Sequence, residues 1–132
     1  MKFEFKRKNH LKSKIIIDEL FSKGKAITKP PFRLVFLEIK NSEFVGIQSL
    51  ISVPKRRFKL AVSRNSIKRK IGEAYRLNSL ELQQVVEELN KHIAIGFIYI
   101  GKRELKFSDS EIKMKNLLLE LSLKLKKSQD EE

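Results

Sequence analysis

The sequence has no cysteine, and only two histidines, five glycines and three prolines among its 132 residues. Without cysteine the chain can form no disulfide and no thiolate site, which fits a reducing compartment. It also lacks a long apolar run, because the three isoleucines at 15–17 are followed at once by Asp18 and Glu19. Neither a signal peptide nor a membrane span is predicted, so we expect a soluble cytoplasmic protein with no membrane partner.

Groups that could form a hydrolytic centre are equally scarce. A protein nuclease needs a general acid and base, commonly two histidines, or a carboxylate cluster that holds metal ions. The spacing of His10 and His92 suggests no pair, and the carboxylates lie scattered among cations. No glycine-rich phosphate loop is present either. We therefore predict no catalytic residue, no metal site and no cofactor bound by this chain alone.

Positive charge is what the chain has in excess. Lys and Arg outnumber Asp and Glu by 29 to 16, which gives a net charge of +13. The excess lies before residue 77, since residues 77–132 carry nine basic and ten acidic side chains. A polyanion such as a nucleic acid is the partner that this distribution favours.

The length and the hydrophobic content of 41% predict one domain over residues 1–132, structured over about 10–125 with frayed ends. Ser13 and Gly24 are suitable caps for a first helix. A second helix begins near Ser63 or Asn65 and continues into an acidic segment. A last helix begins near residue 108 or 109 and carries a stripe of apolar residues: Met114, Leu117, Leu118, Leu121 and Leu125.

Strands are predicted between these helices at 32–39, 44–53 and 93–100, with a further short strand at 60–62. In the first of them Phe32, Leu34 and Phe36 alternate with Arg33, Val35 and Leu37. The second has an apolar face and a more polar, open one with Gln48 and Ser52. The predicted fold is a two-layer α+β sandwich in the order α-β-β-β-α-β-α, with a sheet of about four strands.

The second helix combines an apolar stripe with a basic outer face. Its stripe consists of Ile67, Ile71, Ala74 and Tyr75, while Arg69, Gly72 and Arg76 point roughly opposite. Residues 55–76 contain nine basic side chains and a single acid, Glu73. Such a helix lacks the Glu–Lys pairs that stabilise a solvated surface helix, and its N-terminus favours phosphate. Nucleic-acid binding is therefore favoured over a passive charged surface.

The stretch "VPKRRFKLAVSRNSIKRKIGEAYRLN", with its RN-x-x-KR motif after a basic loop, resembles the signature of the bacterial ribonuclease P protein component. "LKSKIIIDELFSKGK" is similar to that family's first helix, and "IAIGFIYIGK" to its last strand. The resemblance covers roughly residues 10–125. It implies an RNA-binding subunit of an endoribonuclease ribonucleoprotein that removes the 5′ leader from precursor tRNA.

The same resemblance implies that the RNA subunit, with Mg²⁺, performs the hydrolysis. The partners implied are this catalytic RNA and precursor tRNA, with no DNA. It further implies a left-handed β-α-β crossover, and a cleft for the leader between the basic helix and the sheet.

Individual residues follow from the alignment of the motifs. The residues expected to bind RNA by this match are Arg64, Asn65, Lys68, Arg69, Lys55, Arg56 and Arg57. Lys70 and Arg76 are added to them, as cations that restore some of the charge missing from the family's pattern. The residues expected to contact the leader are Phe21, Phe32, Val35 and Phe36. Two positions depart from the family's pattern, with Ser66 where a third Arg is usual and Gly72 where another basic residue is usual.

Three other functions fit the sequence less well. A non-enzymic ribosomal or RNA-chaperone protein would suit the same plan and is disfavoured only by the order of the motifs. A DNA-binding helix–turn–helix would need a helix, and not a strand and loop, before the basic helix. A membrane-surface helix at 109–127 would need interfacial aromatic residues, which that segment lacks.

Overall fold

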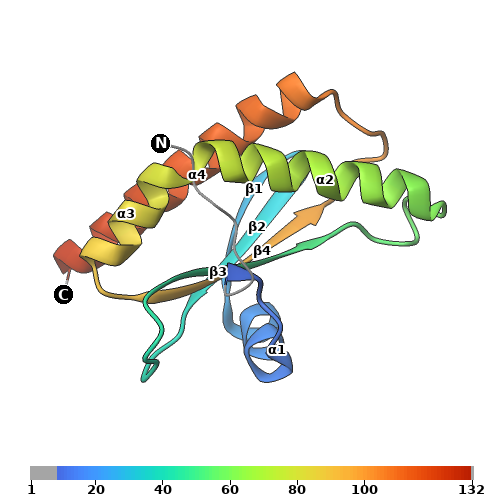
Figure 1. Ribbon diagram of the computed structural model, residues 1–132. Coiled ribbons are helices and arrows are strands. Elements are labelled where there is room, and N and C mark those ends of the chain that lie inside the picture. The colour runs from blue at the N-terminus through green and yellow to red at the C-terminus, as the bar shows by residue number, and fades with distance from the viewer. Residues whose placement is uncertain (1–8, 132) are drawn as a thin grey trace.

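The computed structural model describes residues 9–131, with side chains described up to Ser128. This part of the chain forms four helices and one four-stranded sheet (Figure 1). In chain order the elements are α1 (Lys14–Lys23), β1 (Lys25–Lys29), β2 (Phe32–Glu38), β3 (Gly46–Ser52), α2 (Ala61–Asn78), α3 (Leu80–Glu88), β4 (His92–Tyr99) and α4 (Phe107–Glu131).

The sheet is mixed, with the strand order β1-β2-β4-β3. β4 lies inside the sheet, antiparallel to β2 and parallel to β3. All of its residues but one are buried, as expected for a strand that is apolar on both faces. Because β3 and β4 are parallel, α2 and α3 form the crossover between them. The left-handedness of this crossover stays a prediction.

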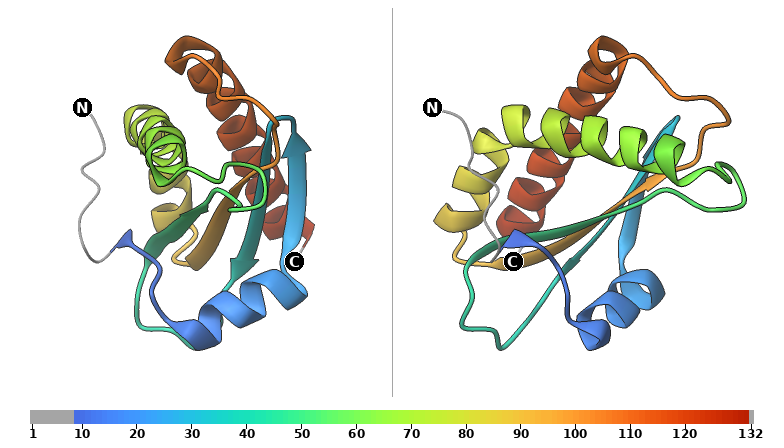
Figure 2. Two further views of the ribbon diagram at one scale, coloured as in Figure 1. Left: turned by 90° about the vertical axis from the view of Figure 1, so that its right-hand side faces the viewer. Right: turned by 45° about the vertical axis from the view of Figure 1, so that its right-hand side comes forward.

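The two faces of the sheet are covered unequally. Helices α2, α3 and α4 pack on one face, and the short helix α1 lies on the other (Figure 2). Alternate residues of β4 separate the two sides: Ile93 and Ile95 belong to the large core under the three helices. Ala94 belongs to a smaller cluster with Leu20 of α1 and Val35 of β2.

The predicted helices are confirmed in their essentials. The Ser13 hydroxyl accepts a hydrogen bond from the Ile16 amide (3.4 Å), and Gly24 ends α1. Only glycine fits there, because a Cβ at Gly24 would lie 2.3 Å from the Leu20 carbonyl oxygen. The apolar stripes predicted for α2 and α4 are buried throughout: Ile67, Ile71, Ala74, Tyr75, Met114, Leu117, Leu118, Leu121 and Leu125.

Three boundaries differ from the prediction. The strand predicted at 60–62 is wrong, because Ala61 and Val62 form the first turn of α2. Its place among the four strands is taken by β1, which the sequence reading missed. α4 continues to Glu131, beyond the limit near 125. The predicted N-terminal fraying falls largely outside the described residues.

Candidate nucleic-acid interface

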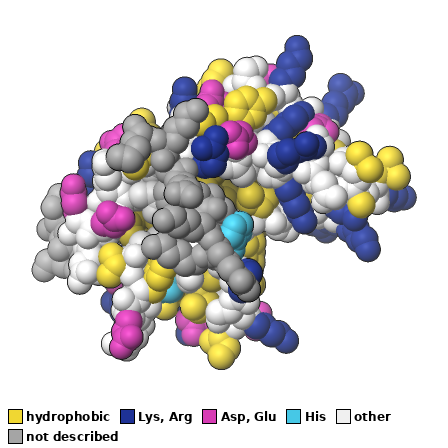
Figure 3. Space-filling view, viewed as in Figure 1, with side chains coloured by type: hydrophobic (Ala, Val, Ile, Leu, Met, Phe, Trp, Pro, Cys, Tyr) yellow, Lys and Arg dark blue, Asp and Glu magenta, His cyan; other side chains and the backbone are white. Residues whose placement is uncertain are grey.

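The α2 helix is fixed by its inner side chains and presents polar and basic ones outward. Ile67, Ile71 and Tyr75 are buried against the sheet and α4, whereas Asn65, Lys68 and Arg69 are exposed. Because the buried side chains hold the helix rigidly, the position of the outer ones is determined by the fold. Figure 3 shows Lys and Arg gathered over α2 and the region where it begins.

The basic loop before α2, residues 54–60, is folded onto the protein by three contacts. The amide of Arg57 donates to the Pro54 carbonyl (3.1 Å), which closes a turn. The Phe58 ring packs on Tyr99 with 5.7 Å between ring centroids. Arg64 donates from Nη1 to the carbonyls of Phe58 (2.8 Å) and Lys59 (2.9 Å). Arg64 thus positions the loop, while the loop's cations remain exposed.

The connection between β4 and α4, residues 100–106, is attached to the same half of α2. Glu104 accepts a hydrogen bond from the Ser66 hydroxyl (2.5 Å) and forms an ion pair with Lys70 (2.6 Å). Lys70 also donates to the Leu105 carbonyl (3.0 Å). The hydrogen bond from Lys70, and then that from Ser66, lowers the pKa of the Glu104 carboxyl. Lys70 is therefore occupied within the protein, and this predicted RNA ligand serves as an attachment point.

Tyr99 joins the two loops. Its ring contacts Phe58 of the first loop, and its hydroxyl donates to the Arg103 carbonyl of the second. Burial raises the pKa of the Tyr99 phenol, so it stays a hydrogen-bond donor at neutral pH. Cations from two segments distant in sequence therefore lie around the start of α2. Together with the exposed Asn65, Lys68 and Arg69 of α2 itself, they form what we name the α2 basic surface. Its members, all exposed, are Lys55, Arg56, Arg57, Lys59, Asn65, Lys68, Arg69, Lys102, Arg103 and Lys106.

The sequence reading missed Lys102, Arg103 and Lys106. The signal was present as three cations in five residues. The net charge of residues 77–132 did not reveal these three cations, because acidic side chains elsewhere in that segment balance them. The single acid among them, Glu104, contacts Ser66 and Lys70 of α2, and the three cations are exposed.

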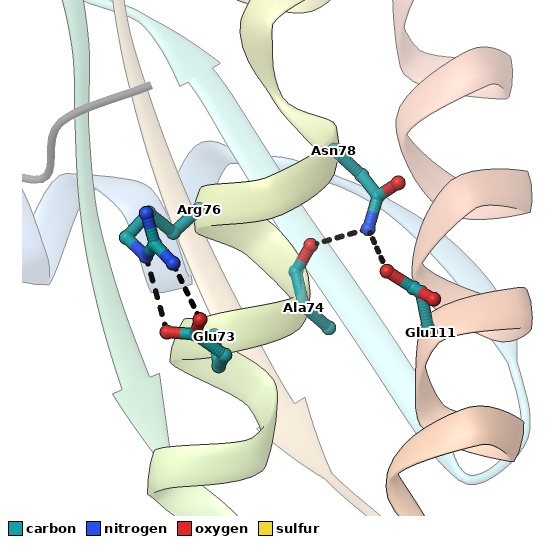
Figure 4. Close-up of polar contacts among 5 residues, drawn as sticks. All are labelled: Glu73, Ala74, Arg76, Asn78 and Glu111. Carbon is teal, nitrogen blue, oxygen red and sulfur yellow. Dashed lines mark hydrogen bonds and ion pairs between the residues drawn. The ribbon is translucent and has the colours of Figure 1, made fainter. Parts of the chain in front are cut away.

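The C-terminal half of α2 is neutralised and tied to α4 (Figure 4). Arg76 forms a two-fold contact with Glu73, at 2.5 Å for Nη2–Oε1 and 3.1 Å for Nε–Oε2. Asn78 donates to the Ala74 carbonyl (2.8 Å) and to Glu111 of α4 (3.0 Å). The cation of Arg76 is thus shared with a carboxylate, and we leave Arg76 out of the α2 basic surface.

The four residues predicted to contact the leader lie on two different faces of the sheet. Phe32 is 1% exposed and Phe36 is 9% exposed, both within the core under the three helices. Phe21 is 47% exposed and packs on the opposite face, where Val35 is buried beneath α1. Buried side chains of the core fill the space between α2 and the sheet. The leader cleft expected there is therefore wrong, and Phe32 is a core residue.

The two histidines have different surroundings. His10 is exposed near the edge of β3, and His92 is buried. The His92 ring nitrogens lie 2.8 Å from the Ser42 hydroxyl and 2.8 Å from Gln48 Oε1, and burial lowers the pKa of His92. Among the described residues, no group of three or more His, Asp or Glu could hold a metal ion, and no helix is long and apolar enough to cross a bilayer.

Comparison with known proteins agrees with this geometry. The profile of the family described as Ribonuclease P matches residues 5–122. The ribonuclease P protein component of Porphyromonas gingivalis strain W83 is 33% identical over 106 residues, covering 80% of this chain and 77% of the relative. The chain belongs to the ribonuclease P protein family. It is the RNA-binding protein subunit of ribonuclease P, which excludes the ribosomal and chaperone alternatives.

Solved structures of ribonuclease P proteins share the fold. The Staphylococcus aureus protein superposes with a TM-score of 0.64 at 19% identity, covering 86% of this chain and 94% of its own. The Thermotoga maritima protein gives 0.63 at 22% identity, covering 83% of this chain and 94% of its own. These similarities show the α+β architecture.

Both departures from the ribonuclease P motif have a structural setting here. Ser66 donates to Glu104, so the missing Arg is replaced by an attachment of the 100–106 loop. Gly72 does not point away from the sheet as the helical periodicity predicted. A Cβ at Gly72 would lie 3.6 Å from Ile51 Cδ1, so this position faces β3.

Proposed function

We propose that the chain binds the catalytic RNA of ribonuclease P through the α2 basic surface. The observation that supports this proposal is that two basic loops converge on one half of α2. The one acid between them, Glu104, is already bound by Ser66 and Lys70. Exposed cations without competing carboxylates bind phosphate oxygens and displace counterions. Arg56, Arg57 and Arg69 add planar donor groups that suit phosphate in a bidentate geometry.

The precursor tRNA leader has a suitable surface on the α1 side of the sheet. The Phe21 ring lies over Gly96, with Cζ 3.3 Å from the position a Cβ would take. In the next cross-strand row, Arg33 and Ser52 flank Ile98, and all three are at least partly exposed. β3 then leads directly into the basic loop at 54–60. An unpaired strand can stack on Phe21, cross this row and reach the loop's cations, with little sequence preference.

The hydrolysis itself is assigned to the catalytic RNA and its Mg²⁺. The chain supplies cations, an aromatic stacking surface and a rigid frame. Protein freed of RNA should therefore leave precursor tRNA intact. RNA-free cleavage that survives nuclease treatment and repurification would contradict this assignment.

The binding surface is tested by removing two of its cations. The double variant Lys68→Gln/Arg69→Gln should bind the catalytic RNA more weakly, because two phosphate contacts are lost. Each lost contact lowers the log–log salt slope of the binding constant by roughly 0.7–0.9, so the slope should fall by about 1.4–1.8. The matched control is Lys115→Gln/Lys126→Gln, which removes two exposed charges from α4. Equal slopes in the two variants would show that Lys68 and Arg69 only solvate the helix.

The attachment of the second loop is tested by Glu104→Ala. This change removes a negative charge, so electrostatics alone would tighten RNA binding. If Glu104 positions Lys102, Arg103 and Lys106, the variant should instead bind more weakly while its stability changes by at most about 1 kcal/mol, as for a surface ion pair. Tighter binding would mean that Glu104 merely repels RNA.

A further inference from the structure

A second basic region lies away from the α2 basic surface. An open pocket of about 430 Å³ is lined by the end of α1, the start of β1, the end of β2 and the last turns of α4. In Figure 2, α4 runs from the upper edge of the molecule down to the C-terminus. Residues of its last turns line one side of the pocket. We call this site the lysine pocket after the residues that line it: Lys23, Lys25, Lys40, Lys91, Lys124 and Lys127.

The charge of the lysine pocket is poorly compensated within the described residues. Glu38 is the one carboxylate in its lining, and it pairs with Lys91 at 3.2 Å. No described carboxylate forms an ion pair with the other five lysines. Like charges around one concavity repel one another, so gathering these lysines is electrostatically unfavourable, and an anion bound among them would relieve the repulsion.

The type of cation narrows the class of ligand. All six basic residues are lysines, whereas the α2 basic surface contains four arginines among its cations. Lysine acts as a mobile point charge and does not impose the fixed two-pronged geometry of arginine. The pocket floor adds apolar surface from Phe36, Leu37 and Leu125. These features suit several phosphates held without sequence readout, since the excess of positive charge is larger than one phosphate group needs.

We propose that the lysine pocket binds the phosphodiester backbone of RNA, as a second contact separate from the α2 basic surface. The identity of the polyanion rests on the proposed function, because the catalytic RNA with its bound precursor is the polyanion that this family serves. The pocket lies on a different part of the molecule from the start of α2. A large RNA would therefore contact the protein at two sites, and the protein would bridge two RNA segments.

The first test measures binding of the full chain to its catalytic RNA across a series of salt concentrations. Lys124→Gln/Lys127→Gln removes two pocket lysines from the outer wall, and Lys115→Gln/Lys126→Gln removes two charges from the same helix outside the pocket. The pocket variant should lower the salt slope by about 1.4–1.8, and the control by clearly less. Equal slopes for both variants would overturn the proposal. The proposed function fails separately, if Lys68→Gln/Arg69→Gln also matches the control.

The second test locates the RNA directly and uses the absence of cysteine from the chain. Ser128→Cys on the pocket rim, Asn65→Cys on the α2 basic surface and Gln84→Cys on exposed α3 each give one attachment point for an iron–EDTA probe. In the assembled complex, hydroxyl radicals from positions 128 and 65 should cut two different RNA segments. Cuts from position 128 no stronger than those from position 84 would overturn the proposal.

A small phosphate ligand would give a different pattern. Inorganic phosphate and adenosine monophosphate are each titrated against the protein alone. Saturable binding that Lys124→Gln/Lys127→Gln abolishes, together with an unchanged RNA salt slope, would assign the pocket to a free phosphate compound and overturn its assignment to RNA. Loss of RNA slope without saturable binding of either compound supports the RNA backbone.

Discussion

The two faces of the sheet use the same strands for different purposes. On the face under α2, α3 and α4, large apolar side chains are buried and continuous. On the α1 face, a small cluster around Leu20 is bordered by the buried, hydrogen-bonded His92 and by a partly exposed row at Arg33 and Ile98. The first face holds α2 in place, and the second leaves surface for a ligand. The alternation of side chains along each strand therefore separates stability from the leader binding that we propose.

The largest effect should come from deleting an aromatic ring on the helix-covered face. Phe32 is buried and packs edge-on against Tyr99 with 5.7 Å between centroids. Phe32→Ala should cost about 3–5 kcal/mol of unfolding free energy, as for other buried phenylalanines. Phe21→Ala should cost clearly less, because Phe21 is 47% exposed. Urea unfolding followed by circular dichroism measures both, and equal losses would show that the two faces are equally packed.

This alternation also explains what the sequence could and could not predict about the leader site. The alternation of side chains along a strand correctly predicts that Phe32 and Phe36 face one side of the sheet and Val35 the other. Nothing in the strand itself tells which face α1 will cover and which the three helices will cover. The predicted leader set therefore mixed both faces, and only packing places Phe32 in the core.

The elements that were predicted well depend on local patterns, and those predicted poorly depend on neighbours. The α2 stripe follows from helical periodicity alone. β1 carries a single buried residue, Ile27, among Lys and Thr side chains, and exists because it pairs with β2 at the sheet edge. α2 begins at Ala61 without a side-chain cap, so the capping residues Ser63 and Asn65 pointed to a later start.

The candidate RNA site shows the same limit. The cations were visible in the sequence, but their internal partners were not. Arg64 bonds to the preceding loop, Lys70 to Glu104, and Arg76 to Glu73. Contacts between residues far apart in the sequence decide which cations remain exposed. Ser66 and Glu104, for example, are separated by 38 positions in the chain.

An intermediate effect should separate leader affinity from stability. Phe21→Leu retains apolar contact with the sheet but loses the flat ring on which a base can stack. Stacking contributes about 1–3 kcal/mol per base, so leader-bearing precursor should bind the assembled ribonuclease P roughly 5- to 150-fold more weakly. Affinity for mature tRNA and the melting temperature should stay nearly unchanged.

The matched variant on the other face is Phe32→Leu. It should lower the melting temperature and leave the ratio of precursor to mature tRNA affinity unchanged. If Phe21→Leu loses stability in proportion to leader affinity, Phe21 is a packing residue and the leader lies elsewhere.

The smallest effect should be a pH dependence that belongs to the α1 face. Burial lowers the pKa of His92 in the folded protein, whereas a histidine in the unfolded chain has a pKa of about 6.5. Below that pH the unfolded chain binds a proton that the folded chain resists, so stability should fall as the pH is lowered from 7 towards 5. The loss should level off once the pH is below the folded pKa.

His92→Gln should flatten this decline, because glutamine can keep hydrogen bonds to Ser42 and Gln48 without gaining a charge. His10→Gln is the control, since His10 is exposed whereas His92 is buried. Melting temperatures between pH 7 and 5 test both variants above the range in which Glu104, whose pKa is lowered, protonates. If the melting temperature still declines in His92→Gln but no longer does so in His10→Gln, the pH-sensitive group lies at the edge of β3. The buried polar part of the α1 face would then be as insensitive to pH as the core under the helices.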